Sequence, residues 1–350
     1  MNHFRFSFVV TGVALLAAAW WGYAHGGSGA ALNALWITAV LAVMEVSLSF
    51  DNAVVNASVL RHWDAFWRKL FLTVGMLVAV FGMRLLFPLL IVAAATGLSL
   101  LDVWTMASTT PDQYARHLRA HHAEVAAFGG AFLLLVFLNF LFDEEKQLHW
   151  LGKIEEKLGS YGSEGLAILL TVGAVFGCTS LVGASDKFAV LSAGIIGVAV
   201  YVGVDWVGGL LEQKEHDPAI GQMIARGSVG AFLYLEVLDA SFSFDGVIGA
   251  FAITNDVVII MLGLAIGAMF VRSLTVFLVQ KGTLDEYVFL EHGAHYAIGI
   301  LALIMLASVR IGIPEWLTGL SGVAFIGVSL YSSVRYKRKH SHGDHDVQSS

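Results

Sequence analysis

The sequence has little charge, little proline and a single cysteine. Only 13% of its 350 residues are charged and 57% are apolar, whereas an ordinary soluble domain is about 25% charged. So little charge cannot cover the surface of a water-soluble globule, and so much apolar content excludes a disordered chain. Cys178 has no second cysteine with which to form a disulfide framework or a thiolate metal site. The net charge of −7 leaves no basic stripe, so nucleic acid is not an expected partner.

About ten mostly apolar segments approach or exceed the roughly 20 residues that a membrane-spanning helix needs. We expect spans at residues 6–24, 33–58, 70–97, 125–142, 165–183, 188–210, 228–252, 256–279, 292–309 and 314–334. The predicted fold is therefore an all-α, polytopic helix bundle whose main partner is the lipid bilayer. The first span follows Arg5 and precedes small residues, so a cleaved signal peptide is the alternative interpretation there.

The basic residues are divided unequally between the two sets of predicted loops. Most of the 20 Lys and Arg residues fall on the side of the N-terminus. The opposite side has only Arg116, Arg119, Lys187 and Arg310. Because cytoplasmic loops are enriched in Lys and Arg, we expect both termini in the cytoplasm and the chain in a bacterial inner (plasma) membrane.

Two stretches outside the spans are polar enough to be solvated. Residues 143–164 predict a short solvated helix. The tail, 335–350, is basic and then rich in histidine, which predicts a cytoplasmic, disordered end, with binding of a transition metal as the alternative.

The same motif occurs in two predicted spans. Residues 45–52 are EVSLSFDN and residues 239–246 are DASFSFDG, and each copy is followed by a span with an Arg-x-Leu pattern, at Arg84 and Arg272. The copies are five spans apart, an odd number, so they cross the membrane in opposite directions. This predicts two inverted five-helix repeats, 1–164 and 165–334, with a site near mid-membrane between them, as in many secondary transporters.

The motif acids need compensation, because an ionised carboxylate within a span costs roughly 2.5–3.5 kcal/mol on insertion scales. Arg84 and Arg272 cannot neutralise five acids, so protons or a bound cation must balance the rest. The alternation of hydroxyl or acid with apolar residues favours locally unwound helices that face each other. Two alternatives stay open, namely continuous helices with the acids on two facets of one cavity, and a static Arg–acid network. The acids are Glu45, Asp51, Glu236, Asp239 and Asp245.

The donor types favour a particular class of ion. Carboxylates, an amide and hydroxyls are hard oxygen ligands, which suit magnesium, calcium or manganese. Protonation removes the affinity of a carboxylate for metal, so the spare acids can couple ion exit to proton entry. The candidate ligands are Glu45, Asp51, Asn52, Glu236, Asp239 and Asp245, supported by Ser47, Ser49, Ser241, Ser243, Arg84 and Arg272.

Other functional residues are few. The sequence has no phosphate-binding loop of the form G-x-x-x-x-G-K-[ST]. We therefore expect an ion gradient or the membrane potential as the driving force. We also expect no enzymatic activity and no tightly bound cofactor. Glu291, His292 and His295 are spaced to share one helix face, which makes them candidates for ion access or proton relay.

The motifs resemble those of the TerC family of integral membrane proteins. The second copy is the closer match, with Glu236, Asp239 and Asp245, a Phe-Ala…Thr…Asp stretch at 251–256 and Arg-Ser-Leu from Arg272. The first copy has the family's Glu-x-x-x-Ser-x-Asp-Asn. The resemblance implies transport, because TerC-like proteins are associated with manganese efflux, metal homeostasis and tellurite resistance. Gly246 stands where the family has serine, which puts one ligand of that half-site in doubt.

Residues and resemblance together predict a secondary-active exporter of a divalent cation in exchange for protons. Manganese is the first candidate and calcium the second. One alternative is a membrane partner protein that delivers metal to other enzymes, or that serves metal or tellurite resistance without transport. Another is a structural membrane protein. The sequence leaves the oligomeric state open, with a homo-oligomer as one alternative.

Overall fold

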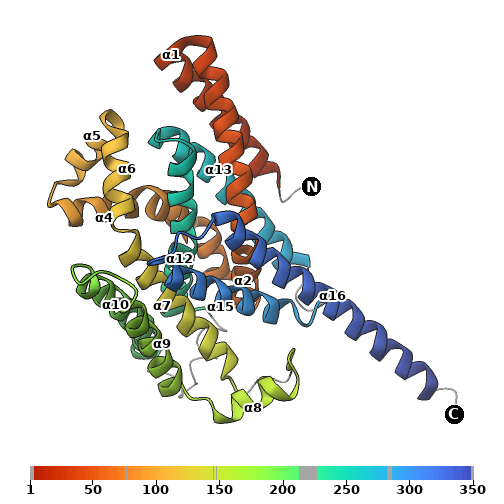
Figure 1. Cartoon of the computed structure of the whole chain (residues 1–350). Helices are drawn as coiled ribbons and strands as arrows, with labels where there is room; N and C mark the ends of the chain where they lie inside the picture. Colours follow the sequence, from red (N-terminus) through yellow and green to blue (C-terminus); the bar gives the residue numbers. More distant parts are fainter. Residues whose placement is uncertain are drawn as a thin grey trace.

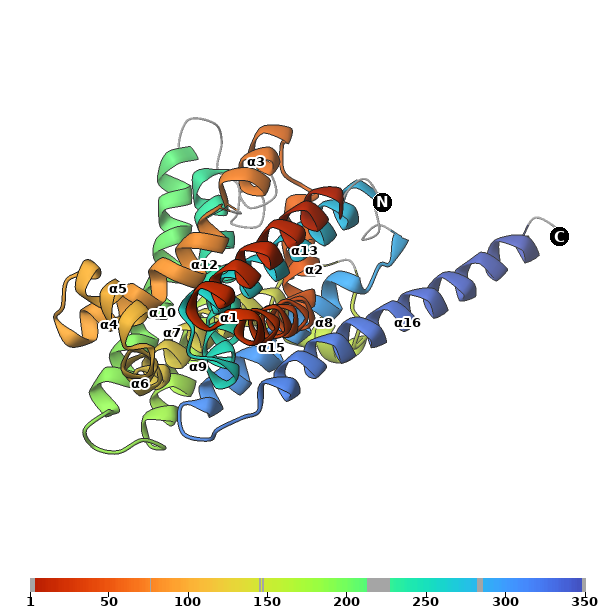
Figure 2. The same cartoon turned by 90° about the horizontal axis from the view of Figure 1, so that it is seen from above.

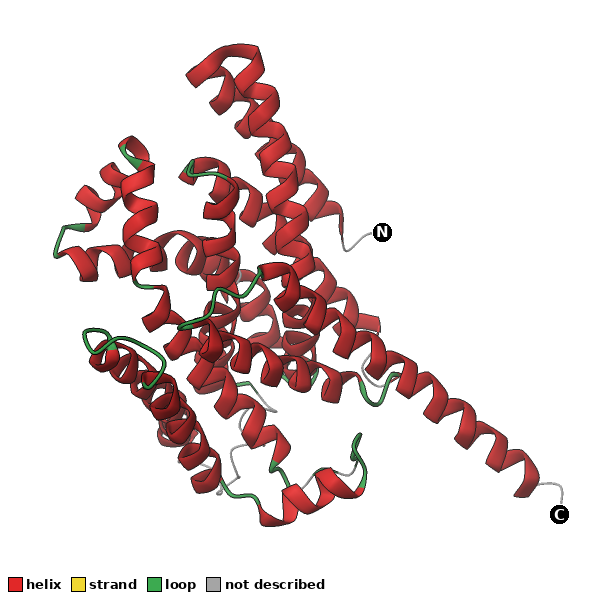
Figure 3. Ribbon diagram, viewed as in Figure 1, coloured by secondary structure: helices red, strands yellow, loops and turns green. Residues whose placement is uncertain are grey.

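The computed structural model describes residues 4–75, 77–144, 146, 148–212, 227–281 and 286–347. It is 86% helical, and the described residues form no strand (Figures 1 and 3). The helices are α1 (Arg5–Leu48), α2 (Phe50–Leu60), α3 (Ala65–Leu70), η2 (Phe71–Gly75), η3 (Val78–Leu86), α4 (Phe87–Thr96), α5 (Leu100–Thr109), α6 (Pro111–Ala120), α7 (His122–Leu141), α8 (Lys153–Tyr161), α9 (Glu164–Thr179), α10 (Lys187–Glu212), α12 (Val229–Ile253), α13 (Val257–Lys281), α15 (Leu290–Ser308) and α16 (Glu315–Val347).

Within the described residues, 7 helical stretches are long and apolar enough to cross a membrane, or 8 if the bent pair α8 and α9 is one span. They are Arg5–Leu48, Ala65–Ala94, His122–Leu141, Lys187–Val204, Val257–Lys281, Leu290–Ser308 and Leu317–Arg338. The all-α prediction is confirmed, and the apolar helices are compatible with a multi-pass membrane protein. The predicted count of ten is not reached by this measure.

Three features account for the difference between ten predicted spans and 7. α9 has 16 residues, fewer than the roughly 20 that span a bilayer. α12 is long enough, at 25 residues, but it contains Glu236, Asp239 and Asp245. The first predicted span and residues 33–48 of the second form the single element α1, and the rest of the second span lies in α2.

α1 is a helical hairpin. Its 44 residues would reach about 66 Å as one straight helix, roughly twice the thickness of the hydrocarbon core. Gly26 and Gly27 have non-helical backbone angles, and Gly27 has φ 72°, a conformation that favours glycine. The chain turns back there (Figure 1). The arms pack closely, because a Cβ on Gly22 would lie 2.6 Å from the carbonyl oxygen of Ala30.

The centre of the bundle is built around α7. Phe132, Leu133 and Leu135 of α7 are completely buried, and α10 and α15 pack on this helix. α1 runs along α13 (Figure 2), whereas α12 packs against η3. Each helix that contains a motif copy therefore packs against the helical segment that follows the other copy.

The predicted span 70–97 contains two π-helical segments, η2 and η3. A π-helix has i→i+5 hydrogen bonds, is rare in proteins and frequently occurs at functional sites. Arg84 lies in η3 and is buried. α4 continues from η3 and ends at Gly97, whose φ of 71° is left-handed.

The two predicted polar stretches each contain helix, which in 143–164 is confined to α8 and the first residue of α9. α8 lies within 143–164, and its axis is bent 98° from that of α9. It is not wholly solvated, because Glu155 is completely buried. α16 runs on to Val347 and projects from the bundle (Figure 1). The backbone of 335–347 is thus helical where we expected a disordered tail, since no proline interrupts it; the side chains of 339–347 and all of 348–350 lie outside the described residues.

Candidate functional site

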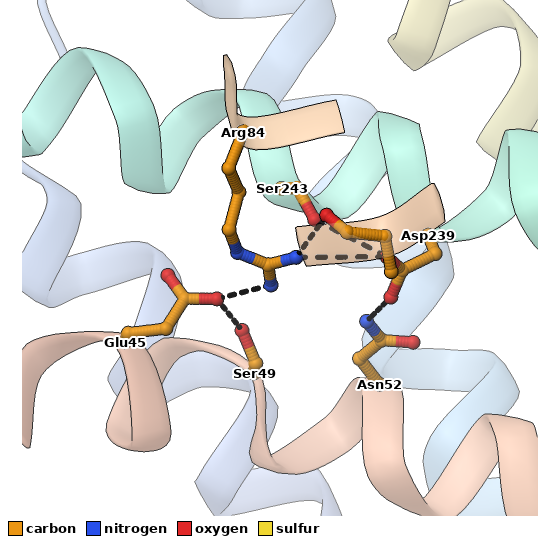
Figure 4. Close-up of polar contacts among 7 residues, drawn as sticks. Glu45, Ser49, Asn52, Arg84, Asp239 and Ser243 are labelled. Atoms are coloured by element: carbon orange, nitrogen blue, oxygen red, sulfur yellow. Dashed lines mark hydrogen bonds and ion pairs between the residues drawn. The ribbon is translucent and has the colours of Figure 1, made fainter. Parts of the chain in front are cut away.

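Arg84 links the two copies of the motif (Figure 4). Its Nη2 donates a hydrogen bond of 2.5 Å to Glu45 Oε1, and its Nη1 lies 3.9 Å from Asp239 Oδ2. Nη1 also donates to the backbone carbonyl oxygen of Ala79 at 2.7 Å. The three charged residues are at most 6% exposed. Two acids from distant parts of the chain therefore share one buried guanidinium.

Serine and asparagine side chains orient the two acids. Ser49 Oγ donates to Glu45 Oε1 at 3.0 Å, and Ser243 Oγ lies 3.5 Å from Asp239 Oδ2. Each serine follows its acid by four residues, which places the pair on one helix face. The Asn52 amide donates to Asp239 Oδ1 at 2.6 Å and so joins α2 to α12. Glu45 and Asp239 hold the same position in the two motif copies, and both lie beside the guanidinium, with Glu45 hydrogen-bonded to it and Asp239 farther away.

The backbone is interrupted at only one of the two motifs. α1 ends at Leu48 and α2 begins at Phe50, with Ser49 at φ −102° and ψ 16°. The Ser49 amide still donates to the Glu45 carbonyl at 3.0 Å, and the Ala53 amide donates to the Ser49 carbonyl at 3.2 Å. The interruption is a bend that frees few carbonyl groups. α12 passes through the second motif as one helix, which matches the alternative of a continuous helix at that copy.

Glycines make room for the acids. A Cβ on Gly246 would lie 2.7 Å from Glu45 Oε2, and one on Gly267 would lie 2.4 Å from Glu45 Cβ. A Cβ on Gly75 would lie 2.5 Å from Glu236 Oε1. At Gly246, where the departure from the family pattern puts one ligand in doubt, the backbone comes so close to Glu45 that a side chain would obstruct the contact. Nothing in the sequence signals this, because glycine is common in membrane helices.

Glu236 lies one turn before Asp239 and is 5% exposed. Among the described residues, neither of its carboxylate oxygens has a hydrogen-bond partner. The side-chain carbonyl oxygens of Asn52 and Asn56 are likewise buried without a donor from the described part of the chain. A buried polar group without a partner costs roughly 1–3 kcal/mol, and more if it is charged. These oxygens are acceptors that a proton or a cation would satisfy.

The acid at the end of the first motif points elsewhere. Asp51 Oδ1 accepts from the Asn52 backbone amide at 2.9 Å. Its Oδ2 faces α16, where a Cβ on Gly322 would lie 2.6 Å away. The corresponding side chain of the second motif, Asp245, lies outside the residues whose side chains the structure describes.

Three other predicted residues, Arg272, Ser47 and Ser241, have hydrogen-bond partners outside the network around Arg84. Arg272 Nε donates to the carbonyl oxygen of Leu72 at 2.7 Å. Ser47 is exposed and bonds to Val43, and Ser241 bonds to Val237, in each case a backbone carbonyl of the same helix. Of the twelve predicted positions, the structure brings Glu45, Ser49, Asn52, Arg84, Asp239 and Ser243 into one network. Within the described side chains, no group of three or more His, Cys, Asp or Glu residues is arranged to hold a metal ion.

A second polar cluster, which the sequence did not reveal, lies where α8 meets α15. Lys146 Nζ donates to Glu155 Oε1 at 2.9 Å, and His292 Nε2 lies 3.6 Å from the same oxygen. His292 also contacts the Leu148 carbonyl oxygen at 2.9 Å. Lys146 and Glu155 belong to a loop and a short helix, so no periodic spacing links them in the sequence.

The three residues predicted to share a helix face at the start of α15 lie close together, because His295 Nδ1 lies 2.9 Å from the Glu291 carbonyl oxygen and the Phe140 ring contacts both histidines. Glu291 pairs with Arg61 at 2.6 Å. His292 belongs to the cluster with Glu155, and His295 stacks on Phe140 with ring centroids 3.9 Å apart.

These observations define the class as an all-helical protein, compatible with several membrane crossings, that has a buried network of one arginine and two carboxylates. Residues 50–340 match the family described as "Protein of unknown function (DUF475)", and the chain belongs to this family. No curated protein and no solved structure matches the chain at a significant level. The family match does not tie the chain to the TerC family, so that resemblance rests on the motif residues alone.

Proposed function

We propose that the chain is a secondary-active transporter that exports a divalent cation in exchange for protons. The observation that carries this proposal is the position of Glu45 and Asp239 on two sides of Arg84. Polar and ionised groups buried among membrane helices are costly, and they mark ion pathways where they converge. Manganese is the first candidate substrate, as in the TerC family that the motifs resemble, and calcium is the second.

The donors near Arg84 support a hard divalent cation. They are the carboxylates of Glu45 and Asp239, the amide of Asn52 and two serine hydroxyls. Carboxylate, amide and hydroxyl oxygens suit manganese and calcium. If both carboxylates are ionised, the guanidinium balances only one of them. Glu236, three residues from Asp239, adds a third acid whose oxygens have no described partner.

In this proposal, Arg84 and the transported cation take turns between the two carboxylates. A cation can bridge Glu45 and Asp239 only after the guanidinium withdraws, because like charges repel strongly where little water screens them. The π-helical segment η3 gives Arg84 a means of moving. Conversion of a π turn to an α turn changes the register of the residues that follow it. Protonation of the acids then releases the metal.

The inverted two-half arrangement, 1–164 and 165–334, is part of the same proposal. It is supported by the cross-packing of α1 on α13 and of α12 on η3. It is also supported by Glu45 and Asp239, which hold matched positions in the two motif copies and both lie beside Arg84. We place both termini in the cytoplasm of a bacterial cell, with the chain in the inner membrane, because the basic residues cluster in the loops on that side.

A second candidate is a membrane partner protein that handles metal without transporting it. One observation favours it: Arg84 already has Glu45, Asp239 and the Ala79 carbonyl as partners. Such a network also describes a static structural role. The two candidates differ in whether the purified chain supports flux.

The test is manganese flux into proteoliposomes that contain the full-length protein, with internal pH recorded at the same time. Glu45→Gln and Asp239→Asn should each abolish both manganese flux and proton counterflow. Ser47→Ala is the matched control, since Ser47 lies in the same motif but is exposed and away from Arg84. Flux that survives both acid substitutions would place the site elsewhere. A folded wild-type protein without flux, co-purifying with other proteins, would favour the partner role.

A further inference from the structure

The short helix α8 exposes an apolar stripe. Ile154 is 65% exposed, Leu158 is 38% exposed and Tyr161 is 82% exposed. Their spacing of four and then three residues places them on one side of the helix. Leu151, just before α8, extends the stripe and is 49% exposed. In a nine-residue helix, this is a large apolar surface that no other described part of the chain covers.

A different face of α8 is fixed to the rest of the protein. Glu155 is completely buried and accepts from Lys146 Nζ at 2.9 Å and from the Leu151 amide at 3.1 Å. One turn later, Gly159 lies so close to the end of α7 that a Cβ would be 3.3 Å from the Asp143 carbonyl oxygen. The helix therefore cannot roll its apolar stripe inward without breaking a buried ion pair.

The direction of α8 relates the stripe to the membrane. α8 is bent 98° from α9 and lies across the end of α7 and α9 (Figure 1). α9 is apolar, and α7 is long and apolar enough to cross a membrane. α9 packs against α7 and α10, which are both long and apolar enough to cross a membrane. If α9 follows their direction, α8 runs along the membrane surface.

Two lysines border the stripe. Lys153 and Lys157 are exposed and lie one turn apart, on the side of the stripe that faces away from Glu155. Helices that lie in the interface between membrane and water combine an apolar stripe with lysine or arginine beside it. Tyrosine is also enriched at that depth, because its ring is apolar and its hydroxyl is polar.

We propose that α8 lies in the membrane–water interface and binds anionic lipid. Ile154, Leu158 and Tyr161 enter the boundary between headgroups and acyl chains, and the two lysines contact lipid phosphates. Charge complementarity and the position beside membrane-crossing helices favour a lipid surface over a protein partner. Through Glu155 and His292, the lipid-bound helix is tied to the start of α15.

The experiment measures the depth of α8 in a bilayer of known composition. The full-length protein with Cys178→Ser is placed in nanodiscs of phosphatidylcholine and phosphatidylglycerol, with a fluorophore attached at Leu158→Cys. Ser160→Cys is the matched control, because Ser160 is exposed on the same helix but away from the stripe. A second variant, labelled at Tyr161→Cys, tests the same stripe if Leu158→Cys does not fold.

We expect lipids with a nitroxide near the headgroup to quench the labels at 158 and 161 several-fold more than the label at 160. Iodide dissolved in the water should quench the label at 160 more than the labels at 158 and 161. Equal quenching by iodide at all three positions would place α8 in water and overturn the proposal. Protection of 158 and 161 from both quenchers would show that a protein or a second copy covers the stripe, which also overturns it.

A further variant tests the role of the lysines. With nitroxide-labelled lipids, Lys153→Gln with Lys157→Gln should reduce the preference for phosphatidylglycerol over phosphatidylcholine at position 161, by up to about fivefold for each lysine lost at low salt. An unchanged preference would remove anionic lipid as the partner. None of these measurements depends on transport, so failure of the lipid proposal can be distinguished from failure of the proposed function.

Discussion

The amide of Asn52 in α2 donates a 2.6 Å hydrogen bond to Asp239 Oδ1 in α12, and both side chains are buried. This bond holds one oxygen of Asp239, while the other oxygen faces Arg84 and Ser243. Asn52 therefore fixes the direction of the acid on which the second motif depends. It also joins the two motif copies by a route that does not pass through Arg84.

The first prediction concerns this bond. Asn52→Leu should lower the free energy of unfolding by about 1.5–3 kcal/mol, the usual contribution of a hydrogen bond to a charged group. Asn52→Asp should be worse, because two carboxylates would meet at hydrogen-bonding distance. Asn52→Asp combined with Asp239→Asn restores a donor–acceptor pair and should recover part of the loss. Denaturant unfolding in detergent measures all three, and failure of the double variant to recover would show that the bond itself matters little.

The second prediction concerns the guanidinium. Arg84→Met leaves Glu45 and Asp239 buried near each other without a cation, which should cost about 3–5 kcal/mol of unfolding free energy. Arg272→Met is the control, because Arg272 Nε bonds to the Leu72 carbonyl and the residue is only partly buried. The same unfolding experiment compares them. Equal losses for the two arginines would mean that Arg84 does not compensate the acids.

Part of this network is predictable from the sequence for a sound physical reason. Acids within apolar segments are costly, so their repetition at matched positions, followed each time by an arginine, is enough to place Glu45, Asp239 and Arg84 among the candidates. The repetition does not tell which of two adjacent side chains faces the partner motif. Neighbouring residues on a helix point about 100° apart, so only one of the two can face the second motif. In the structure Asn52 faces Asp239, and Asp51 faces α16.

For the fold as well, the features that depend on composition are predictable from the sequence, and the features that depend on local geometry are not. Hydropathy identifies the apolar helices, because burial in lipid depends on composition. Hydropathy does not show that the chain turns back at Gly26 and Gly27, so that the first predicted span and most of the second form one helical hairpin. That turn depends on the backbone angles of the two glycines. Nor does hydropathy show that Lys146 meets Glu155, because that contact depends on how a loop folds beneath the bundle.

The third prediction tests the need for glycine beside Glu45. Gly246→Ala would place a Cβ 2.7 Å from Glu45 Oε2, so the acid must move. Overpacking of a buried site typically costs about 1–3 kcal/mol. Gly173→Ala in α9 is the matched control, because a Cβ there meets nothing within 4 Å, and it should stabilise the helix by roughly 0.5–1 kcal/mol. Thermal unfolding that ranks the two variants in the opposite order would contradict the close approach.

The fourth prediction concerns the attachment of α8 to the bundle. Glu155→Gln keeps the shape of the side chain and an acceptor for the Leu151 amide, but it leaves Lys146, whose side chain is 8% exposed, without its counter-ion. Removing one member of a buried pair costs about 3–5 kcal/mol. α8 should therefore detach locally, which hydrogen exchange of peptides covering residues 141–163 would detect as faster deuterium uptake.

Two variants separate loss of the ion pair from general damage to α8. Glu156→Gln changes the neighbouring but exposed acid and should leave exchange unchanged, since surface substitutions are usually worth less than about 0.5 kcal/mol. Lys146→Met with Glu155→Gln removes both charges and should restore slow exchange, because a buried ion pair can often be replaced by neutral groups at little cost. If the double variant exchanges as fast as Glu155→Gln alone, the uncompensated lysine is not what releases the helix, and the attachment must depend on the packing of Gly159 against α7.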